Sequence, residues 1–386
     1  MKSKNKNLTI LGLETSCDET AAAIIKAKNN QVKILSNIVS SQIKIHQKYG
    51  GVFPELASRT HLENIIPVVN EAIDEAKIKL ENIDLIAVTT GPGLIGSLLI
   101  GVNFAKTLAY TLQKPVIPVN HLEGHIFSSF AGETPNSKFL ILNSAKLFPI
   151  ISLVVSGGHT SLILMEKLGN YKTIGETQDD AAGEAFDKVA ALLGLPYPGG
   201  PTIEAAASKF KSQISNLKIT LPRPMLNSNN HDFSFSGLKT AVLYLIKQVP
   251  DGRKTNVSAF ARQRAGYGGS AEVFNEGRRR AVAKEFQQAV IDVLISKTIS
   301  AAKKYKTKTI ILCGGVSANR ALRKQMSEKI RQNIPNSLFF IPNSGLFTDN
   351  AAMIAIAGYY KSLKTKPQKW YDINADSNER LKNWVK

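Results

Sequence analysis

LTILGLETSCDETAAAIIK (residues 8–26) holds two short apolar runs separated by a polar turn. Apolar runs of this length that end in polar turns are typical of buried strands, so we expect strand, turn, strand. A second stretch of the same design, IISLVVSGGHTSLILM, covers residues 150–165. The repeated design predicts two structurally duplicated lobes, with a cleft between them that strand ends and helix starts face.

The rest of the chain alternates helical and strand patterns. Apolar residues at helical spacing mark the ranges 54–72 and 286–305, and short apolar runs mark 85–88, 115–119 and 309–312. This alternation predicts an α/β layer structure. A polar segment near residues 132–147 interrupts the alternation, and we expect the lobe boundary there. The predicted units are an N-terminal lobe, a C-terminal lobe, and a C-terminal helix and tail that return to the first lobe, at 1–135, 136–344 and 345–386.

Residues 250–280 differ in composition from the rest of the second lobe. Lys, Ile and Asn give way to Arg, Gly and Ala, as in ARQRAGYGG and RRR. We interpret this segment as a surface insertion, mostly flexible. A basic arm that faces RNA and an insert without function are both compatible with it.

Composition limits the class of protein. The chain has 386 residues, of which 43% are hydrophobic, so it can bury a substantial core. Its formal net charge of +19 favours a polyanionic partner, although an AT-rich genome would also enrich lysine. Cys17 and Cys313 lie far apart, which argues against a disulfide framework and fits a reducing cytoplasm.

Two apolar segments could be mistaken for targeting or membrane elements. The basic start of the chain is followed by an apolar run that Glu14 and Asp18 soon break, so we predict no signal peptide. The range 94–112 is the most apolar, but it contains Asn103 and Lys106. We interpret it as a core helix rather than a membrane span, with Gly96 and Gly101 allowing close packing on a sheet.

The sequence HLEGH contains two histidines at an i, i+4 spacing, His121 and His125. On a helix they share one face and could bind one cation, although two ordinary polar contacts would give the same pattern. Asp349 is a third candidate ligand. It also precedes an apolar helical run, so an N-cap is its default interpretation. Two imidazoles and a carboxylate would suit Zn or Fe(II).

Polar turns after strands are candidate phosphate-binding sites. Gly157 and Gly158 would let backbone amides approach a phosphate or an acyl group, and a plain hairpin is the alternative. The strand at 309–312 leads into CGGVSANR, an arrangement frequent in nucleotide-binding folds but weak by itself.

Ten motifs, taken in order, closely resemble one family, the universal tRNA threonylcarbamoyltransferases, formerly named O-sialoglycoprotein endopeptidases. The motifs are LGLETSCDET, GGVFPELASRTH, TTGPGLIGSLLIG, NHLEGH, VVSGGHT, DDAAGEAFDKVA, YPGGP, FSFSGLKT, LCGGVSANR and FTDNAAMIA. The resemblance implies the two-lobed fold shared by actin, sugar kinases and heat-shock chaperone ATPases. One departure is Asn120, where a histidine is common in the family; it leaves both candidate ligands intact.

The resemblance also implies a reaction. The family transfers the threonylcarbamoyl group from threonylcarbamoyl-AMP to N6 of the adenosine 3′ of the anticodon, in tRNAs that read ANN codons, and releases AMP. It implies an enzyme that makes the donor, an inactive paralogue of the same fold and, in bacteria, a small ATPase. We expect a cytoplasmic enzyme that does not act at a membrane.

Site residues follow from the resemblance motif by motif. His121, His125 and Asp349 resemble the family's metal ligands, for one divalent ion, with Fe(II) favoured and Zn as the alternative. The positions that resemble its adenylate contacts are Val154, Val155, Ser156, Gly157, Gly158, Asp187, Gly200, Glu204 and Asn319. Asp18 and Glu19 fall where the family's functionally sensitive acids lie.

The chemistry of the donor agrees with these assignments. A carbamic-phosphoric anhydride is already activated, so the enzyme has to position it, stabilise charge on the carbamoyl oxygen and accept a proton. The exocyclic amine of adenine is a poor nucleophile. We therefore predict Asp18 or Glu19 as the general base or amine-orienting group.

Three alternatives remain to be weighed. In a zincin metalloprotease the glutamate directly follows the first histidine, whereas Glu123 comes two residues after His121, so proteolysis is disfavoured. A small-molecule kinase or a carbamoyltransferase of the same fold would need no histidine pair. A non-catalytic scaffold would have lost the ligands, and all three are present.

Overall fold

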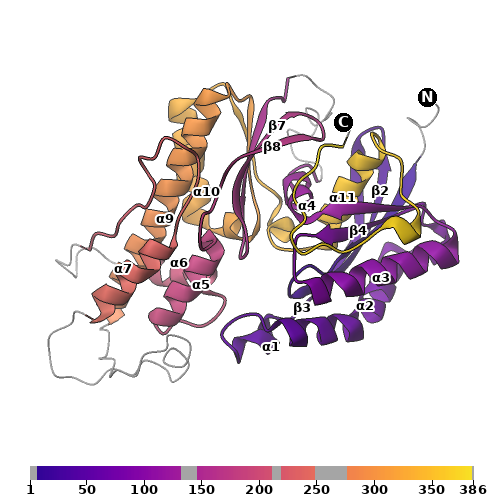
Figure 1. Cartoon of the computed structure of the whole chain (residues 1–386), viewed down its shortest axis with the longest axis horizontal. Helices are drawn as coiled ribbons and strands as arrows, with labels where there is room; N and C mark the ends of the chain where they lie inside the picture. Colours follow the sequence, from indigo (N-terminus) through magenta and orange to yellow (C-terminus); the bar gives the residue numbers. More distant parts are fainter. Residues whose placement is uncertain (1–6, 132–145, 211–218, 248–275, 385–386) are drawn as a thin grey trace.

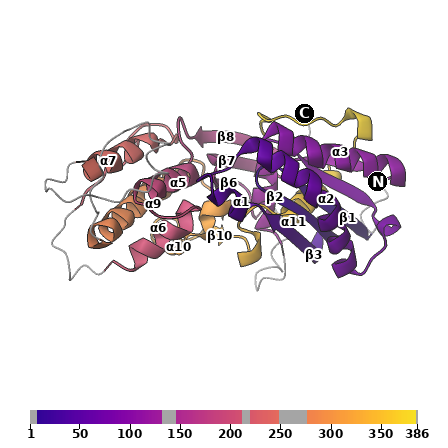
Figure 2. The same ribbon diagram turned by 90° about the horizontal axis from the view of Figure 1, so that it is seen from below.

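The computed structural model describes residues 7–131, 146–210, 219–247 and 276–384. They form two lobes that lie side by side along the long axis of the molecule (Figures 1 and 2). Each lobe is built on a mixed sheet with helices, so the predicted α/β class is confirmed. The proposed lobe boundary at 135/136 falls outside the described residues.

The first sheet has five strands in the order β3-β2-β1-β4-β5. Their bounds are β1 Leu8–Glu14, β2 Glu19–Lys28, β3 Gln31–Ser41, β4 Leu85–Gly91 and β5 Val116–Asn120. β1, β2 and β3 pair antiparallel, whereas β1, β4 and β5 pair parallel. Every residue of β4 is buried, as expected for a strand that is covered on both faces.

The second sheet repeats this topology in the order β10-β9-β6-β7-β8. Its strands are β6 Ile150–Val155, β7 Thr160–Lys167, β8 Asn170–Glu176, β9 Thr309–Cys313 and β10 Leu338–Phe340. β6, β7 and β8 pair antiparallel, and β6, β9 and β10 pair parallel. The predicted duplication is therefore present, with β1-β2 and β6-β7 as equivalent hairpins.

Three helices accompany the first sheet: α1 Ile43–Gln47, α2 Pro54–Ala76 and α3 Ile95–Leu112. α3 packs against α2 and β4, yet only a third of its length is buried. Among the described helices it is the one long and apolar enough to cross a membrane.

The expected packing of the two α3 glycines on a sheet needs a correction. A Cβ on Gly96 would lie 2.3 Å from Ser58 Oγ of α2, and a Cβ on Gly101 would lie 2.4 Å from Thr15 Oγ1. Gly96 therefore lets α3 approach another helix, and Gly101 lets it approach the turn that follows β1.

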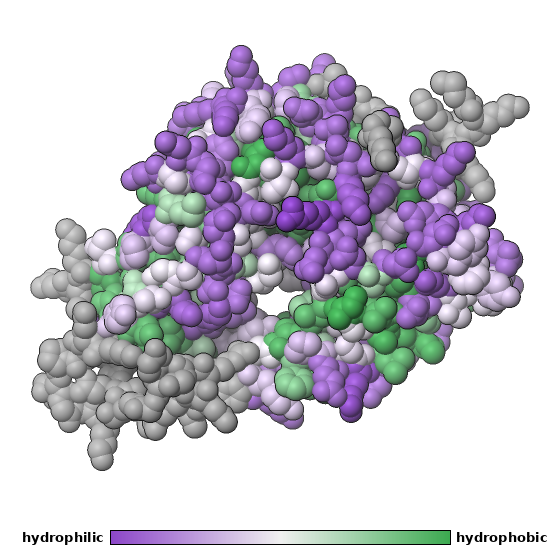
Figure 3. Space-filling view, viewed as in Figure 1, coloured by the Kyte–Doolittle hydropathy of each residue, from purple (hydrophilic) through white to green (hydrophobic). Residues whose placement is uncertain are grey.

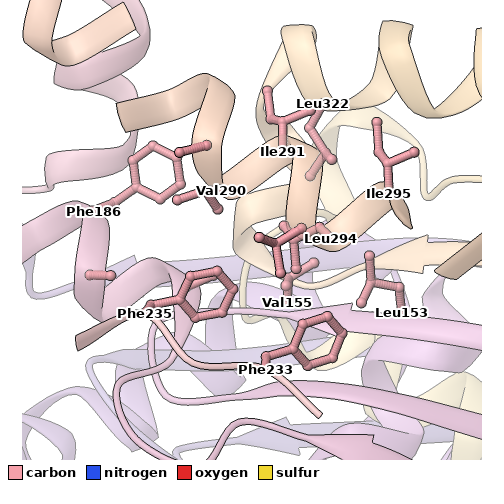
Figure 4. Packing of buried hydrophobic residues seen from close by; sticks show 14 of the residues in the cluster. Leu153, Val155, Phe186, Phe233, Phe235, Val290, Ile291, Leu294, Ile295 and Leu322 are labelled. Carbon is pink, nitrogen blue, oxygen red and sulfur yellow. The ribbon is translucent and has the colours of Figure 1, made fainter. Parts of the chain in front are cut away.

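The second sheet carries the helices α5 Ala182–Leu192, α6 Gly199–Ser208, α7 Ser236–Lys247, α9 Glu276–Lys304 and α10 Arg320–Asn333. Figure 4 shows the core between them, in which Phe186, Phe233 and Phe235 meet aliphatic side chains of α9 and α10. α9 begins ten residues before the predicted start at 286. Arg278, assigned from sequence to the insertion, is thus part of this helix; residues 250–275 of the insertion lie outside the described residues.

Two further helices, α4 His121–Ser128 and α11 Ala351–Ser362, form a layer between the sheets. Their apolar side chains share one buried cluster with residues of both sheets, including Ile10 and Ile117 from the first and Ile150 from the second. Within the described residues the short helices are η1 Leu80–Asn82, η4 Gly315–Ala318, η5 Ser344–Leu346 and η6 Trp370–Asp372. The layer matters for the candidate site because His121 and His125 lie on α4 and Asp349 lies just before α11.

Candidate active site

A cleft of about 1290 Å³ lies between the lobes, and Figure 3 shows the molecule hollowed at this position. The turn after β1 and the start of α4 line it from the first lobe. The turn after β6, the starts of α5, α6 and α10, and the loop before α11 line it from the second half of the chain. The carboxyl ends of β1 and β4 in one sheet and of β6 and β9 in the other thus face one space, which is where α/β folds bind ligands.

His121, His125 and Asp349 form a compact cluster beside this cleft. Their ligand atoms all lie within 4.8 Å of one another, and Asp349 Oδ1 is 3.5 Å from His121 Nε2 and 3.2 Å from His125 Nε2. Atoms bound at about 2.1 Å to one cation lie about 3.0 to 3.4 Å apart at angles between 90° and tetrahedral. The spacing therefore fits a shared cation.

The hydrogen bonding of His125 supports the same interpretation. Its ring is fully buried, Nδ1 has no hydrogen-bond partner among the described residues, and Nε2 faces the Asp349 carboxylate at 3.2 Å without a well-aligned hydrogen bond. Buried ring nitrogens without good hydrogen bonds are costly, and a metal ligand bond would reduce that cost. The residues therefore fit a bound metal ion.

Local capping explains how the ligands are aimed. Asn120 caps α4 by accepting a hydrogen bond from the Leu122 amide at 3.0 Å. At α11 the cap is Asn350, whose side chain accepts from the Met353 amide at 3.0 Å. The N-cap interpretation of Asp349 was therefore wrong. Because its neighbour caps the helix, the Asp349 carboxylate is free to face the histidines.

Glu14, at the end of β1, is a functional candidate that the sequence analysis missed. It is fully buried, and its Oε2 lies 3.1 Å from His121 Nδ1 and accepts from Thr89 Oγ1 at 2.6 Å. A carboxylate on Nδ1 fixes the ring and leaves Nε2 free to bind a metal. The available signal was an acid at the end of an otherwise apolar strand.

Charge in this cluster favours a cation. Burial opposes protonation of His121, but the carboxylates of Asp349 and Glu14 outweigh it and raise its pKa to about 9. Burial would raise the pKa values of both carboxyls, yet the facing His121 holds them below their ordinary values. Two carboxylates that stabilise a proton here would also attract a divalent ion.

His159 is a third histidine of the site, and it too was missed. It lines the cleft in the turn after β6, with its ring centroid 6.2 Å from that of His121. Burial and the charges of His121 and His125 lower its pKa to about 4. It is therefore a neutral imidazole, able to accept or donate one hydrogen bond.

The predicted acids lie on the cleft wall: Asp18 ends the turn after β1, and Glu19 is the first residue of β2. Asp18 is buried and Glu19 half-buried. Burial, with the Asp18 charge beside it, raises the pKa of Glu19 well above its ordinary value. Burial likewise raises the pKa of the adjacent Cys17 thiol, which is therefore neutral.

The turn after β6 is open to the cleft. A Cβ added at Gly157 or Gly158 would meet no atom within 4 Å, so their backbones are accessible. Val154 and Val155, by contrast, point into the two cores on either side of β6 and do not line the cleft. Only their backbone atoms could take part in binding.

The remaining candidates line the same cleft but have protein partners. Asp187 Oδ1 accepts from the Gly199 amide at 2.6 Å, and Glu204 Oε1 accepts from the Arg320 amide at 2.7 Å. Asn319 caps α10 and donates to Gln287 Oε1 at 2.8 Å. A Cβ at Gly200 would meet nothing within 4 Å. These contacts hold the helix starts at the cleft.

Comparison with known proteins decides the family. The family model for tRNA N6-adenosine threonylcarbamoyltransferase matches residues 33–356. The chain belongs to this family. Proteins named tRNA N6-adenosine threonylcarbamoyltransferase from Syntrophomonas wolfei and Dehalococcoides mccartyi are 49% and 47% identical over 91% and 93% of this chain. The matches cover 91% and 95% of those proteins.

Solved structures support the fold. HypF from T. kodakarensis superposes with a TM-score of 0.57 at 14% identity, over 93% of this chain and 48% of that one. Full-length HypF in the phosphate- and nucleotide-bound form gives a TM-score of 0.52 at 13% identity, over 95% of this chain and 48% of that one. The two-lobed architecture expected of a threonylcarbamoyltransferase is confirmed.

In this family member Glu123 cannot serve as a protease base. Its Oε1 accepts from Trp384 Nε1 at 2.6 Å, and its Oε2 lies 3.3 Å from Lys361 Nζ. The glutamate therefore has two partners away from the histidine face of α4, which agrees with the expectation from its spacing.

Proposed function

We propose that this chain transfers the threonylcarbamoyl group from threonylcarbamoyl-AMP to N6 of the adenosine 3′ of the anticodon, in tRNAs that read ANN codons. Membership of the family over residues 33–356 carries the proposal. The cleft supports it, because candidate ligand, adenylate and acid residues from both lobes line one space.

One divalent ion is proposed on His121, His125 and Asp349. Two imidazoles and one carboxylate suit Fe(II), which we favour, and also Zn. A bound ion with open positions supplies Lewis-acid polarisation of the carbamoyl oxygen. Glu14 holds the His121 ring in the orientation that such binding needs.

Asp18 is the proposed general base. A base at neutral pH has to be ionised, and the raised pKa of Glu19 favours its neutral carboxyl form. The protonated Glu19 would instead donate a hydrogen bond to the acceptor base or to Asp18. This assigns different roles to the two acids that sequence alone left equivalent.

The adenylate end of the donor is proposed to lie along the second lobe. The exposed backbone at Gly157 and Gly158 leaves room for a phosphate to approach, and Gly200 is equally open. Ser156, Asp187, Glu204 and Asn319 line the same wall, and the strand backbone at Val154 and Val155 lies beneath it. The amides of a turn after a strand are suited to an anion.

The proposed partners are tRNA, an inactive paralogue of the same fold and a small ATPase, in the cytoplasm. The net charge of +19 supports binding to RNA. A paralogue could cover the apolar surface over α2 and α3, visible in Figure 3, where Leu62, Ile66 and Ile95 are 64%, 58% and 49% exposed. Exposed apolar patches of this kind mark protein interfaces.

A single-turnover transfer assay with radiolabelled donor tests the acid assignment. Asp18→Asn should lower the rate constant by about 10²- to 10⁴-fold, the contribution usual for a positioned base. Glu19→Gln should lower it less than about tenfold, because the raised pKa of Glu19 favours the neutral carboxyl, which a neutral amide resembles. Glu166→Gln, an exposed acid on β7, is the control. A wild-type rate for Asp18→Asn would reject the assignment.

A further inference from the structure

The C-terminal tail contacts α4, the helix that carries His121 and His125. Residues 376–384, here called the tail strap, cross the ends of β4 and β5 and then contact the β7-β8 hairpin of the other lobe. We propose that the tail strap positions α4, and with it His121 and His125, and that Trp384 and Glu123 are its positioning residues.

Glu123 is the residue of α4 that accepts a hydrogen bond from the tail strap. It lies between the two histidines in sequence, and its side chain is 1% exposed. Trp384 Nε1 donates to Oε1 at 2.6 Å. Lys361 Nζ, from α11, lies 3.3 Å from Oε2, which also accepts from the Asn120 amide at 3.4 Å. The carboxylate thus joins the tail, α11 and the start of α4.

Trp384 packs against residues of both lobes. Its ring stacks on Phe127 of α4 with centroids 5.5 Å apart, and meets Tyr171 of β8 edge-on at 6.1 Å. Its amide donates to the Gly169 carbonyl at 2.9 Å. A Cβ on Gly169 would lie 2.3 Å from the indole ring, so the hairpin turn leaves room for this side chain.

Further hydrogen bonds fix the strap before and beside Trp384. The Asp376 amide donates to the Thr90 carbonyl at 2.8 Å, and Thr90 Oγ1 donates to Glu379 Oε2 at 2.9 Å. Asn120 Nδ2, at the cap of α4, donates to the Glu379 carbonyl at 3.2 Å. Asn383 Oδ1 accepts from the Tyr171 amide at 2.6 Å. The strap is therefore bound at both ends of its course.

These contacts bear on the metal site through helix geometry. His121 and His125 lie on the face of α4 that meets Asp349, while Glu123 and Phe127 carry the strap contacts. A rotation of this short helix would move both imidazoles relative to Asp349. Loss of residues that orient metal ligands typically weakens metal binding about 10- to 100-fold.

A purely structural anchor is the competing explanation, so the test needs a readout of metal geometry. Co(II) absorbance reports both affinity and coordination number. We would titrate Co(II) into the full chain and into Trp384→Phe, Glu123→Gln and the double variant, at a temperature where all are folded by circular dichroism. Trp370→Phe, which changes an exposed tail tryptophan, is the matched control.

We expect Trp384→Phe and Glu123→Gln each to weaken Co(II) binding about 10- to 100-fold and to change the visible spectrum. Glutamine keeps one acceptor oxygen for the donors of Trp384, Lys361 and Asn120, so Glu123→Gln changes more than the Trp384 contact, and the double variant should bind Co(II) at least as weakly as the weaker single variant. Trp370→Phe should match the wild type. Wild-type affinity and spectrum in Trp384→Phe would overturn the proposal.

The inference rests on the proposed metal site in one respect, and the two can fail separately. If the wild type bound no Co(II), the metal assignment would fail, and hydrogen exchange of residues 121–128 would then decide the positioning role. Faster exchange there in Trp384→Phe than in Trp370→Phe would support the strap. Equal exchange would overturn it.

Discussion

Replacing Glu14 by glutamine probes how the protein prepares His121 for a metal. Glutamine has the same shape, so the fold should be retained. Glu14 Oε1 accepts from the Ser16 amide at 2.5 Å, and this bond requires an oxygen. The amide nitrogen therefore takes the place of Oε2, which faces His121 Nδ1 at 3.1 Å.

That exchange should disfavour the histidine tautomer that binds a metal. Binding through Nε2, the nitrogen that faces Asp349, leaves the ring proton on Nδ1, and an NH₂ group cannot accept that proton as the Glu14 carboxylate does. The variant also loses a nearby negative charge. We expect an affinity about 10- to 100-fold weaker, which corresponds to about 1.4 to 2.7 kcal/mol.

Chelator competition with Zn or Co(II) measures this difference, with Glu166→Gln as a control that removes an exposed carboxylate. The control should bind metal as the wild type does. Wild-type affinity in a folded Glu14→Gln protein would refute the orienting role of Glu14.

Three further expectations concern stability. Gly124→Ala would place a methyl group 2.7 Å from Ile354 Cδ1 and should lower the free energy of unfolding, measured by urea titration, by about 1 to 3 kcal/mol. Adding Ile354→Val, which removes Cδ1, should recover part of this loss. An unchanged free energy of unfolding in Gly124→Ala would contradict the close approach of α4 and α11. Four hydrogen bonds from residues 234–236 outweigh burial and lower the pKa of Asp179 in the folded protein below its ordinary 3.8. The ionised carboxylate therefore stabilises the fold above pH 3.8, and this stabilisation is lost as the pH falls through the pKa of the folded protein. At pH 7 the free energy of unfolding of the wild type should therefore exceed that of Asp179→Asn by up to about 1 kcal/mol, a value reduced by solvent screening. A difference of the same size at pH 2 would contradict this. Zn at 100 times its dissociation constant should raise the free energy of unfolding by about 2.7 kcal/mol, and calorimetry of His125→Ala should show no such gain; equal gains would place the metal elsewhere.

Local patterns were enough for most of the architecture. The apolar runs at the two hairpins and the helical spacing after Pro54 predicted elements that the structure contains, because burial on a sheet or a helix face imposes a short period. The i, i+4 spacing of His121 and His125 predicted their shared face for the same reason.

Contacts between distant segments could not be predicted in this way. Glu14 is separated from His121 by 107 residues and Trp384 from Glu123 by 261, so no local pattern signals either pair. The residue pattern gave Asp349 an N-cap role by default, because two adjacent residues could cap α11 and the pattern does not say which one does, whereas the family resemblance gave it as a metal ligand. The start of α9 was placed too late because its first turns are rich in arginine rather than apolar.

The most direct test of the account is mass-spectrometric nucleoside analysis of tRNA after incubation with this protein, threonylcarbamoyl-AMP and the proposed partner proteins. One tRNA should carry the acceptor adenosine, and a matched tRNA should have guanosine at that position. We expect threonylcarbamoyladenosine only in the first tRNA, and none with the His121→Ala, His125→Ala variant. Absence of the product with the wild-type protein and every partner set, or its formation at wild-type level by the double variant, would contradict the account.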